Sequence, residues 1–224
     1  MNDDGYNAPG IDAVVQALRK EPALTIKVVA PDKNNSGAGG RVSAGTVTYS
    51  QAKTLSGYPA ISVHGTPADS ANVAFDQLHL KPDVVISGAN AGQNLGPIVD
   101  VSGTVGAARV SARHGVLSLA VSSGFPKFDF ATAARYAIDW FRTERPSLPR
   151  TSTATPATLE GLNVPSCSAG SVRGELKLPE QTAFLPGESA LAAQDCTSTA
   201  KPTTEVAAFT DGYATIVPLP LNPK

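Results

Sequence analysis

The chain has 224 residues, of which 42% are hydrophobic and 17% are charged, and its formal net charge is −1. This length suits one domain, or one domain with an extension, and the apolar fraction is sufficient for a buried core. The near-neutral charge argues against a nucleic-acid polymer as a partner. The sequence contains no run of 18 or more apolar residues, so it predicts no membrane span.

The first part of the chain alternates between helix and strand patterns. Ile11, Val14, Val15 and Leu18 share one apolar helix face, and a short strand is predicted over 25–30. The patterns then predict, in order, a glycine-rich loop over 36–40, an extended segment or hairpin over 42–53, a strand over 60–64 and a helix that ends at 78.

Two apolar runs, at 82–88 and 116–121, have the continuous hydrophobic pattern of buried parallel strands. An alanine-rich helix that ends at Arg113 lies between them, and an amphipathic helix over 130–142 follows the second run. Strands that alternate with helices predict an α/β fold, namely a three-layer, mostly parallel Rossmann-like sheet with helices on both faces.

The periodic pattern fades after Arg145, where Pro, Ser and Thr become frequent up to about residue 202. We interpret this segment as an irregular arm, and residues 206–217, which regain strand character, are expected to return to the body. The sequence thus predicts a core over 1–144 and an irregular C-terminal arm over 145–224.

The two cysteines, Cys167 and Cys196, both lie in the predicted arm. They are either separate thiols or a disulfide, which would close a loop of roughly 30 residues and contribute about 3–4 kcal/mol in the chain-entropy model. A disulfide would indicate an oxidising compartment and therefore export, whereas free thiols would fit the cytoplasm.

Polar residues follow the predicted strands at the edge where an open parallel sheet binds its ligands. Ser36 and Asn90 come after two of these strands, and the adjacent carboxylates of Asp3 and Asp4 would complete the set. Two carboxylates with neutral oxygen ligands are suited to a hard divalent cation. His64, at the end of another strand, is a candidate general acid.

Ser102, Gly103 and Thr104 open the alanine-rich helix, so their backbone N–H groups and the helix dipole form an anion site. A cation beside such a site neutralises phosphate charge and lowers the pKa of a bound water, so that hydroxide attacks phosphorus without a protein nucleophile. Each motif alone is also typical of an ordinary turn or helix cap. Their joint position at one sheet edge favours a metal-dependent phosphatase.

Five ordered motifs resemble the SurE family of nucleotide phosphatases. They begin with Asn-Asp-Asp-Gly and Ala-Pro-Gly-Ile within 2–11, continue with Val-Val-Ala-Pro-Asp and Ser-Gly-Ala within 28–38 and Gly-Thr-Pro-Ala-Asp at 65–69, and end with the segments 87–96 and 102–108. The resemblance covers the body well and the segment 145–202 weakly. The chain's departures from the family pattern are similar to those of an actinobacterial-style branch whose members often carry export signals.

The resemblance implies a nucleoside 5′- or 3′-monophosphate phosphohydrolase that needs a divalent metal such as Mg²⁺ or Mn²⁺ and forms a homodimer or homotetramer. Asp3, Asp4 and Asn90 would have the catalytic role, and the metal ligands would be these three residues with Ser36. Asn94 and the segment 102–104 would lie near the phosphate. Two alternatives stay open, namely another phosphoester or polyphosphate hydrolase on the same scaffold and a non-catalytic nucleotide- or metal-binding protein.

In the SurE family an apolar strand precedes the Asn-Asp-Asp-Gly motif, whereas only Met1 precedes Asn2 here. Burial of each Val, Ile or Leu side chain contributes roughly 1.5–3 kcal/mol. Several such residues together would match the ~5–15 kcal/mol stability of a whole domain. We therefore expect the first strand of the fold to be missing, and the chain to be weakly stable and to bind metal weakly.

Overall fold

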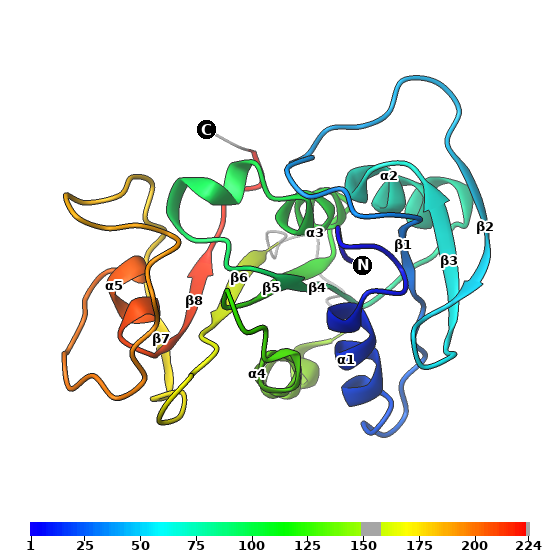
Figure 1. Ribbon diagram of the computed structural model, residues 1–224. Coiled ribbons are helices and arrows are strands. Elements are labelled where there is room, and N and C mark those ends of the chain that lie inside the picture. The colour runs from blue at the N-terminus through cyan, green and yellow to red at the C-terminus, as the bar shows by residue number, and fades with distance from the viewer. Residues whose placement is uncertain (149–157, 223–224) are drawn as a thin grey trace.

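The structure is a computed structural model that describes residues 1–148 and 158–222, and it contains two β-sheets (Figure 1). The smaller sheet has the order β1-β3-β2, formed by β1 (Val29–Pro31), β2 (Thr48–Lys53) and β3 (Pro59–His64). The larger has the order β4-β5-β6-β8-β7, formed by β4 (Val84–Ala91), β5 (Leu117–Ser123), β6 (Leu159–Val164), β7 (Glu175–Lys177) and β8 (Ala214–Pro218). Strands β4, β5 and β6 are parallel, and β1 is parallel to β3.

Helices cover both faces of the sheets. The helices are α1 (Pro9–Leu18), α2 (Pro67–Asn72) with a π turn (Val73–Gln77), α3 (Gly103–Arg113), α4 (Phe130–Glu144) and α5 (Glu205–Thr210), with 3₁₀ turns at Gly96–Asp100 and Arg145–Ser147. In Figure 1, α1 and α4 lie on one side of the sheets and α2 and α3 on the other. The predicted three-layer α/β fold is confirmed. The extended segment expected over 42–53 is confirmed only from Thr48 on, and β2 pairs in antiparallel register with β3, the strand expected over 60–64, instead of forming a hairpin within 42–53.

The main core lies between β5 and α4. Every residue of β5 is buried, and Leu119 and Val121 pack with Trp140 and Phe141 of α4. The opposite face of the sheet packs on Val105 and neighbouring small residues of α3. The continuous apolar pattern of β5 therefore follows from burial on both faces.

The C-terminal part contains more regular structure than the sequence predicts. β6 lies within the segment expected to be irregular, yet it pairs with β5 on one side and β8 on the other, so that expectation is wrong for Leu159–Val164. A six-residue strand is too short to stand out in a segment rich in Pro, Ser and Thr. The same expectation for residues 149–157 lies outside the described part of the chain.

The strand expected over 206–217 is also partly wrong, because the chain forms α5 first and β8 only from Ala214. Val206 and Phe209 are three residues apart, and both pack on Leu95 in a small buried cluster. Spacing of three fits one face of a helix. Without knowledge of the contact with Leu95, the aromatic and β-branched residues of this segment favour a strand.

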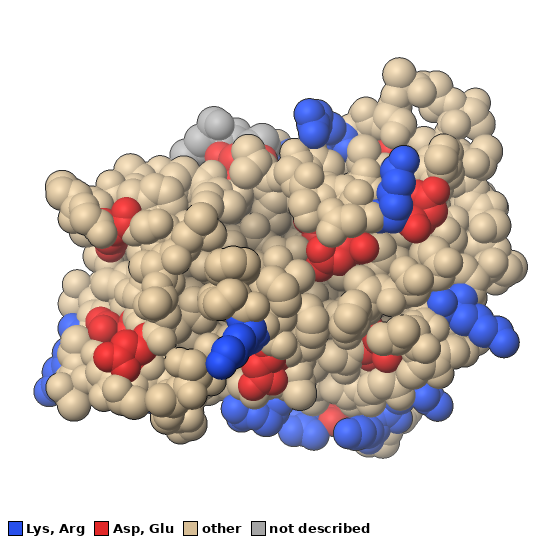
Figure 2. All heavy atoms as spheres, viewed as in Figure 1, with Lys and Arg blue, Asp and Glu red and all other residues tan. Residues whose placement is uncertain are grey.

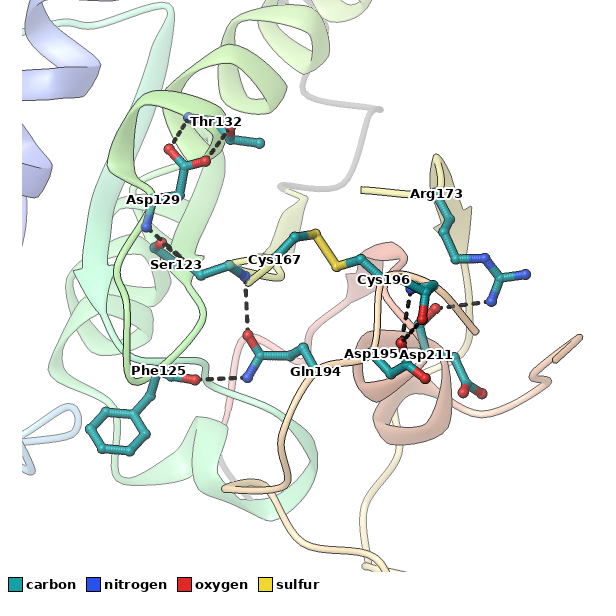
Figure 3. Close-up of a disulfide and its surroundings, with 12 residues drawn as sticks. Ser123, Phe125, Asp129, Thr132, Cys167, Arg173, Gln194, Asp195, Cys196 and Asp211 are labelled. Atoms are coloured by element: carbon teal, nitrogen blue, oxygen red, sulfur yellow. Dashed lines mark hydrogen bonds between the residues drawn. A yellow bond between two sulfur atoms is a disulfide. The ribbon is translucent and has the colours of Figure 1, made fainter. Parts of the chain in front are cut away.

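Cys167 and Cys196 form a disulfide, with a Cα–Cα distance of 5.7 Å, so the first of the two sequence interpretations, separate thiols, does not hold in this structure. The bridge joins the segment after β6 to the segment before α5 (Figure 3). Beside it, the Gln194 amide donates to the Phe125 carbonyl and accepts from the Ser166 N–H. The arm is therefore attached to the loop that follows β5.

Strands β1 and β4 are not paired, and a cavity of about 600 Å³ separates them. Apolar residues line it, among them Val14, Val28, Val29, Val85 and Phe141. Met1 lies on the β4 side of this gap, where its amine donates to the Ile86 carbonyl over 2.9 Å and its carbonyl accepts from the Gly88 N–H over 2.8 Å. The sheet expected to be continuous is therefore divided into two.

Charge is spread thinly over the surface. In Figure 2 basic and acidic side chains are both scattered over the face shown, and one acidic group lies near its middle. Within 1–148 and 158–222, no helix combines the length and the apolar character needed to cross a membrane.

Candidate functional site

Asp3 lies against the N-terminus of α3. Its side chain is buried and accepts a hydrogen bond from the Thr104 hydroxyl, while its carbonyl accepts from the Asn35 N–H over 2.7 Å. A Cβ atom on Gly103 would lie 2.9 Å from Asp3 Oδ2 and 2.8 Å from Asp3 Cβ. Glycine at 103 therefore allows the Asp3 carboxylate to reach the first turn of the helix.

Asp4 connects the two sheets at their carboxyl edges. Its Oδ1 accepts from the Asn34 amide and its Oδ2 from the Ala91 N–H, both over 3.0 Å. Asn34 belongs to the loop after β1, and Ala91 is the last residue of β4. Figures 1 and 2 place the N-terminal loop between α1 and α3, at the acidic region in the middle of this face.

Of the two neutral residues of the predicted ligand set, Ser36 lies on the loop after β1, whereas Asn90 lies within β4, beside its last residue, and not after the strand as expected. Asn90 is buried, and its amide nitrogen donates to the Gly92 carbonyl over 2.6 Å, so its oxygen is the atom that could bind a cation. Ser36 is exposed, and its N–H donates to Asn34 Oδ1 over 2.8 Å. The Asn34 amide therefore links Ser36 to Asp4.

Asn94 is held inside the protein. Its N–H donates to Asn163 Oδ1 over 2.7 Å, its side-chain amide donates to the Ser122 hydroxyl over 2.8 Å, and its carbonyl accepts from the Asn163 amide. These bonds come from β5 and β6. Asn94 therefore fixes the 91–96 loop to the centre of the larger sheet, close to the predicted site.

The start of α3 has the form expected of an anion site. The Ser102 hydroxyl accepts from the Val105 N–H over 3.2 Å, so Ser102 is the N-cap. The first N–H groups of a helix have no carbonyl partner within it, which favours an anion there. The Thr104 hydroxyl and the Thr104 N–H both interact with the Asp3 carboxylate, so the N–H of Gly103 is the better phosphate donor.

Burial raises the pKa of the Asp3 carboxyl, the hydrogen bond from Thr104 opposes this shift, and the neighbouring Asp4 charge adds to it. A nearby divalent cation would reverse the effect, because it stabilises the ionised carboxylate. The described residues contain no group of three or more His, Cys, Asp or Glu side chains that could hold a metal. Two carboxylates with amide and hydroxyl oxygens nevertheless fit a hard cation that keeps some water ligands.

Two polar contributors were not identified from the sequence. Asn34 orients Asp4, and the amide nitrogen of the buried Asn2 has no hydrogen-bond partner, although Asn2 Oδ1 accepts from the Asp3 N–H. Asn2 directly precedes the acidic pair in the sequence, and this position is the signal from which its role could have been predicted. An orphaned buried donor next to an anion site is chemically suited to a phosphate oxygen.

A general acid of the candidate site would have to lie beside Asp3 and Asp4, whereas His64 contacts a different carboxylate. Its Nδ1 lies 2.7 Å from Asp32 Oδ2, and its side chain is 72% exposed. Neither residue has a recorded contact with Asp3 or Asp4. The structure therefore gives His64 a carboxylate partner at the ends of β1 and β3, and its role as a general acid stays a prediction.

Glu205 supports the loop that carries Asn94. Its side chain is 1% exposed, its Oε2 accepts from the Gly96 N–H over 3.1 Å, and burial raises the pKa of its carboxyl to about 7. The folded protein therefore retains this proton up to a higher pH than the unfolded chain does. Between pH 4.5 and about 7, Glu205 contributes a loss of stability as pH rises, because only the unfolded chain releases this proton.

We expect Glu205→Gln to remove a few kcal/mol of this pH-dependent loss in the free energy of unfolding. Urea unfolding at pH 5 and pH 7.5 measures the loss in wild type and variant. Asp76→Asn, at an exposed carboxylate, serves as the control and should keep the wild-type slope. If the free energy of unfolding changed between pH 5 and pH 7.5 by the same amount in Glu205→Gln as in the wild type, Glu205 would not be the group with the raised pKa.

Comparison of the sequence and comparison of the structure with known proteins identify the same family. The family described as "Survival protein SurE" matches residues 1–183. The "5'-nucleotidase SurE" of Symbiobacterium thermophilum is 36% identical over 178 residues, which cover 77% of this chain and 67% of that protein. The "5'/3'-nucleotidase SurE" of Yersinia pseudotuberculosis is 33% identical over 236 aligned positions, with 99% of this chain and 88% of the relative covered.

A solved structure, the SurE protein of Aquifex aeolicus, superposes with a TM-score of 0.76 at 27% sequence identity. The aligned part covers 100% of this chain and 92% of the Aquifex aeolicus chain. The family match spans the acidic loop, the polar loops after β1 and β4 and the start of α3. These are the parts that the structure brings together at one sheet edge. The chain belongs to the SurE family of proteins.

Proposed function

We propose that the protein is a divalent-metal-dependent phosphomonoesterase that hydrolyses nucleoside 5′- and 3′-monophosphates to nucleoside and phosphate. The observation that carries this proposal is the contact of the buried Asp3 with the start of α3, beside Asp4. A cation site thereby adjoins an anion site. The names of the relatives, 5'-nucleotidase and 5'/3'-nucleotidase, support the substrate class.

Mg²⁺ or Mn²⁺ is the proposed metal, with Asp3, Asp4, Ser36 and Asn90 as its ligands. The hydrogen bonds that orient both carboxylates and the all-oxygen donor set support this assignment. The cation, when bound, supplies charge neutralisation for the phosphate and a water of lowered pKa as nucleophile.

The protein's own groups then position the ester. The N–H group of Gly103 binds a phosphate oxygen with the support of the α3 dipole. The Thr104 hydroxyl holds one carboxylate oxygen of Asp3, and the Ala91 N–H holds one of Asp4, so neither side chain needs to reorder when substrate binds. The Asn2 amide nitrogen provides a further donor for a phosphate oxygen.

We propose a homodimer or homotetramer, which light scattering of the purified protein measures, and a monomer at working concentration would contradict it. We propose export on the basis of the Cys167–Cys196 disulfide, because such bonds persist in oxidising compartments. Alkylation of both cysteines in unreduced cells would contradict export.

Release of inorganic phosphate from AMP tests the function. We expect turnover with Mn²⁺ or Mg²⁺, loss of turnover with EDTA and recovery when metal is added back. A panel of nucleotides, sugar phosphates and polyphosphate separates a nucleotidase from another phosphoester hydrolase. Tight AMP binding without phosphate release under any metal would instead identify a non-catalytic binding protein.

A further inference from the structure

Three phenylalanines lie together after β5, at the carboxyl edge of the larger sheet. Phe125 is 48% exposed and Phe128 is 37% exposed, with ring centroids 6.1 Å apart. Phe128 also stacks on Phe130, with centroids 5.7 Å apart. We refer to these three rings as the aromatic cluster. Large exposed apolar groups that lie together at a ligand-binding edge suit a ligand with an apolar face.

The aromatic cluster borders the loop that carries Asn90. The Phe125 N–H donates to Gln93 Oε1 over 2.8 Å, three residues along the chain from Asn90. At the other end of the cluster, the Phe130 ring lies 3.0 Å from where a Cβ on Gly10 would stand, and Gly10 also packs on the Ala89 carbonyl. The cluster and the proposed metal site therefore share the 89–93 segment as a common wall.

Hydrogen bonds fix the backbone of Phe125 on both sides. Gln93 accepts from its N–H, and Gln194 donates to its carbonyl over 2.8 Å. Gln194 is in turn two residues from Cys196 of the disulfide. Figure 3 shows the Phe125 ring directed away from Gln194 and the bridge. The loop thus presents this ring outward on a supported backbone instead of packing it into the core.

We propose that the aromatic cluster is the nucleobase subsite, where the base stacks on Phe125 and Phe128 while the phosphate lies at the start of α3. This inference rests on the proposed function, because it places the base of the same substrate. Every nucleobase has a π face, so stacking gives affinity with little preference among bases.

The test is the double variant Phe125→Ala/Phe128→Ala with two esters, AMP and ribose 5-phosphate, which lacks a base. We expect kcat/KM for AMP to fall about tenfold and that for ribose 5-phosphate to stay near the wild-type value. Phe125→Tyr should retain AMP turnover, because its ring still stacks. Leu55→Ala, which truncates another exposed apolar side chain on the β2–β3 hairpin, is the matched control.

Calorimetric titration of AMP in the presence of Mn²⁺ separates this inference from the proposed function. If the wild type binds AMP but releases no phosphate, the function fails, while weaker AMP binding by the double variant would still support the subsite. Equal losses for AMP and ribose 5-phosphate would overturn the subsite. Unchanged AMP binding with a smaller assembly in light scattering would also overturn it, in favour of a subunit contact.

Discussion

Asp3→Asn is expected to abolish phosphate release while leaving the fold intact. Asparagine keeps an oxygen that can accept from the Thr104 hydroxyl, and it has nearly the shape of the carboxylate. It removes one of two negative charges that the proposed cation needs. Because the loss acts on both the metal and the transition state, we expect a fall in kcat/KM for AMP of at least about 100-fold.

A stability measurement separates loss of metal binding from loss of fold. Binding of a ligand to the folded state raises the melting temperature, and tighter binding raises it more. Wild type should therefore melt higher with added Mn²⁺, whereas Asp3→Asn should melt at the same temperature with and without it. Asp76→Asn, an exposed carboxylate on the π turn, should behave as wild type. An Mn²⁺-dependent shift that survives in Asp3→Asn would contradict the assignment of this ligand.

The meeting of the predicted residues at one sheet edge could be predicted from the sequence because it depends on strand direction. The loops after β1 and β4 and the start of α3 meet at one edge once the strands between them are parallel. The pattern could not supply the contacts within the site. That the Thr104 hydroxyl serves Asp3 and that Asn34 orients Asp4 depends on side-chain directions over 101 and 30 residues of sequence separation.

The C-terminal part was harder to predict because its order depends on tertiary contacts. β6 is buried only because β5 and β8 flank it, and α5 forms over a segment whose Val206 and Phe209 pack on Leu95, far away in sequence. Local propensity yields to such packing. The Cys167–Cys196 disulfide was one of two interpretations, since two cysteines without a structure do not indicate whether they meet.

An added N-terminal strand is expected to stabilise the protein more than any single substitution. The gap between β1 and β4 has apolar walls, and Met1 already makes two parallel-strand hydrogen bonds to the β4 backbone at Ile86 and Gly88. A short run of Val, Ile and Leu placed before Met1 would continue this pairing and fill the cavity. Each buried side chain contributes roughly 1.5–3 kcal/mol, which backbone ordering partly offsets.

The net gain should be about 4 kcal/mol, which for a chain of this size raises the melting temperature by about 10 °C. The Mn²⁺-dependent shift should also grow, because Asn2 and Asp3 then follow a paired strand. An extension of the same length made of Ser and Gly is the control, since it cannot fill an apolar cavity. Equal melting temperatures for the two extended proteins would show that the gap does not accept a strand.

The pH profile tests the burial of the Met1 amine separately. Burial lowers the pKa of the Met1 amine from 8.0 to about 5, so between these values the unfolded chain binds more protons than the folded one. This amine therefore contributes a rise in stability with pH from about 5 to 8, opposite in sign to the contribution of Glu205. In both extended proteins the same nitrogen is a neutral amide, so this contribution should disappear. Thermal melts at pH 5.5 and 8.5 would detect the difference, and an equal change in melting temperature with pH in all three proteins would contradict the burial of the Met1 amine.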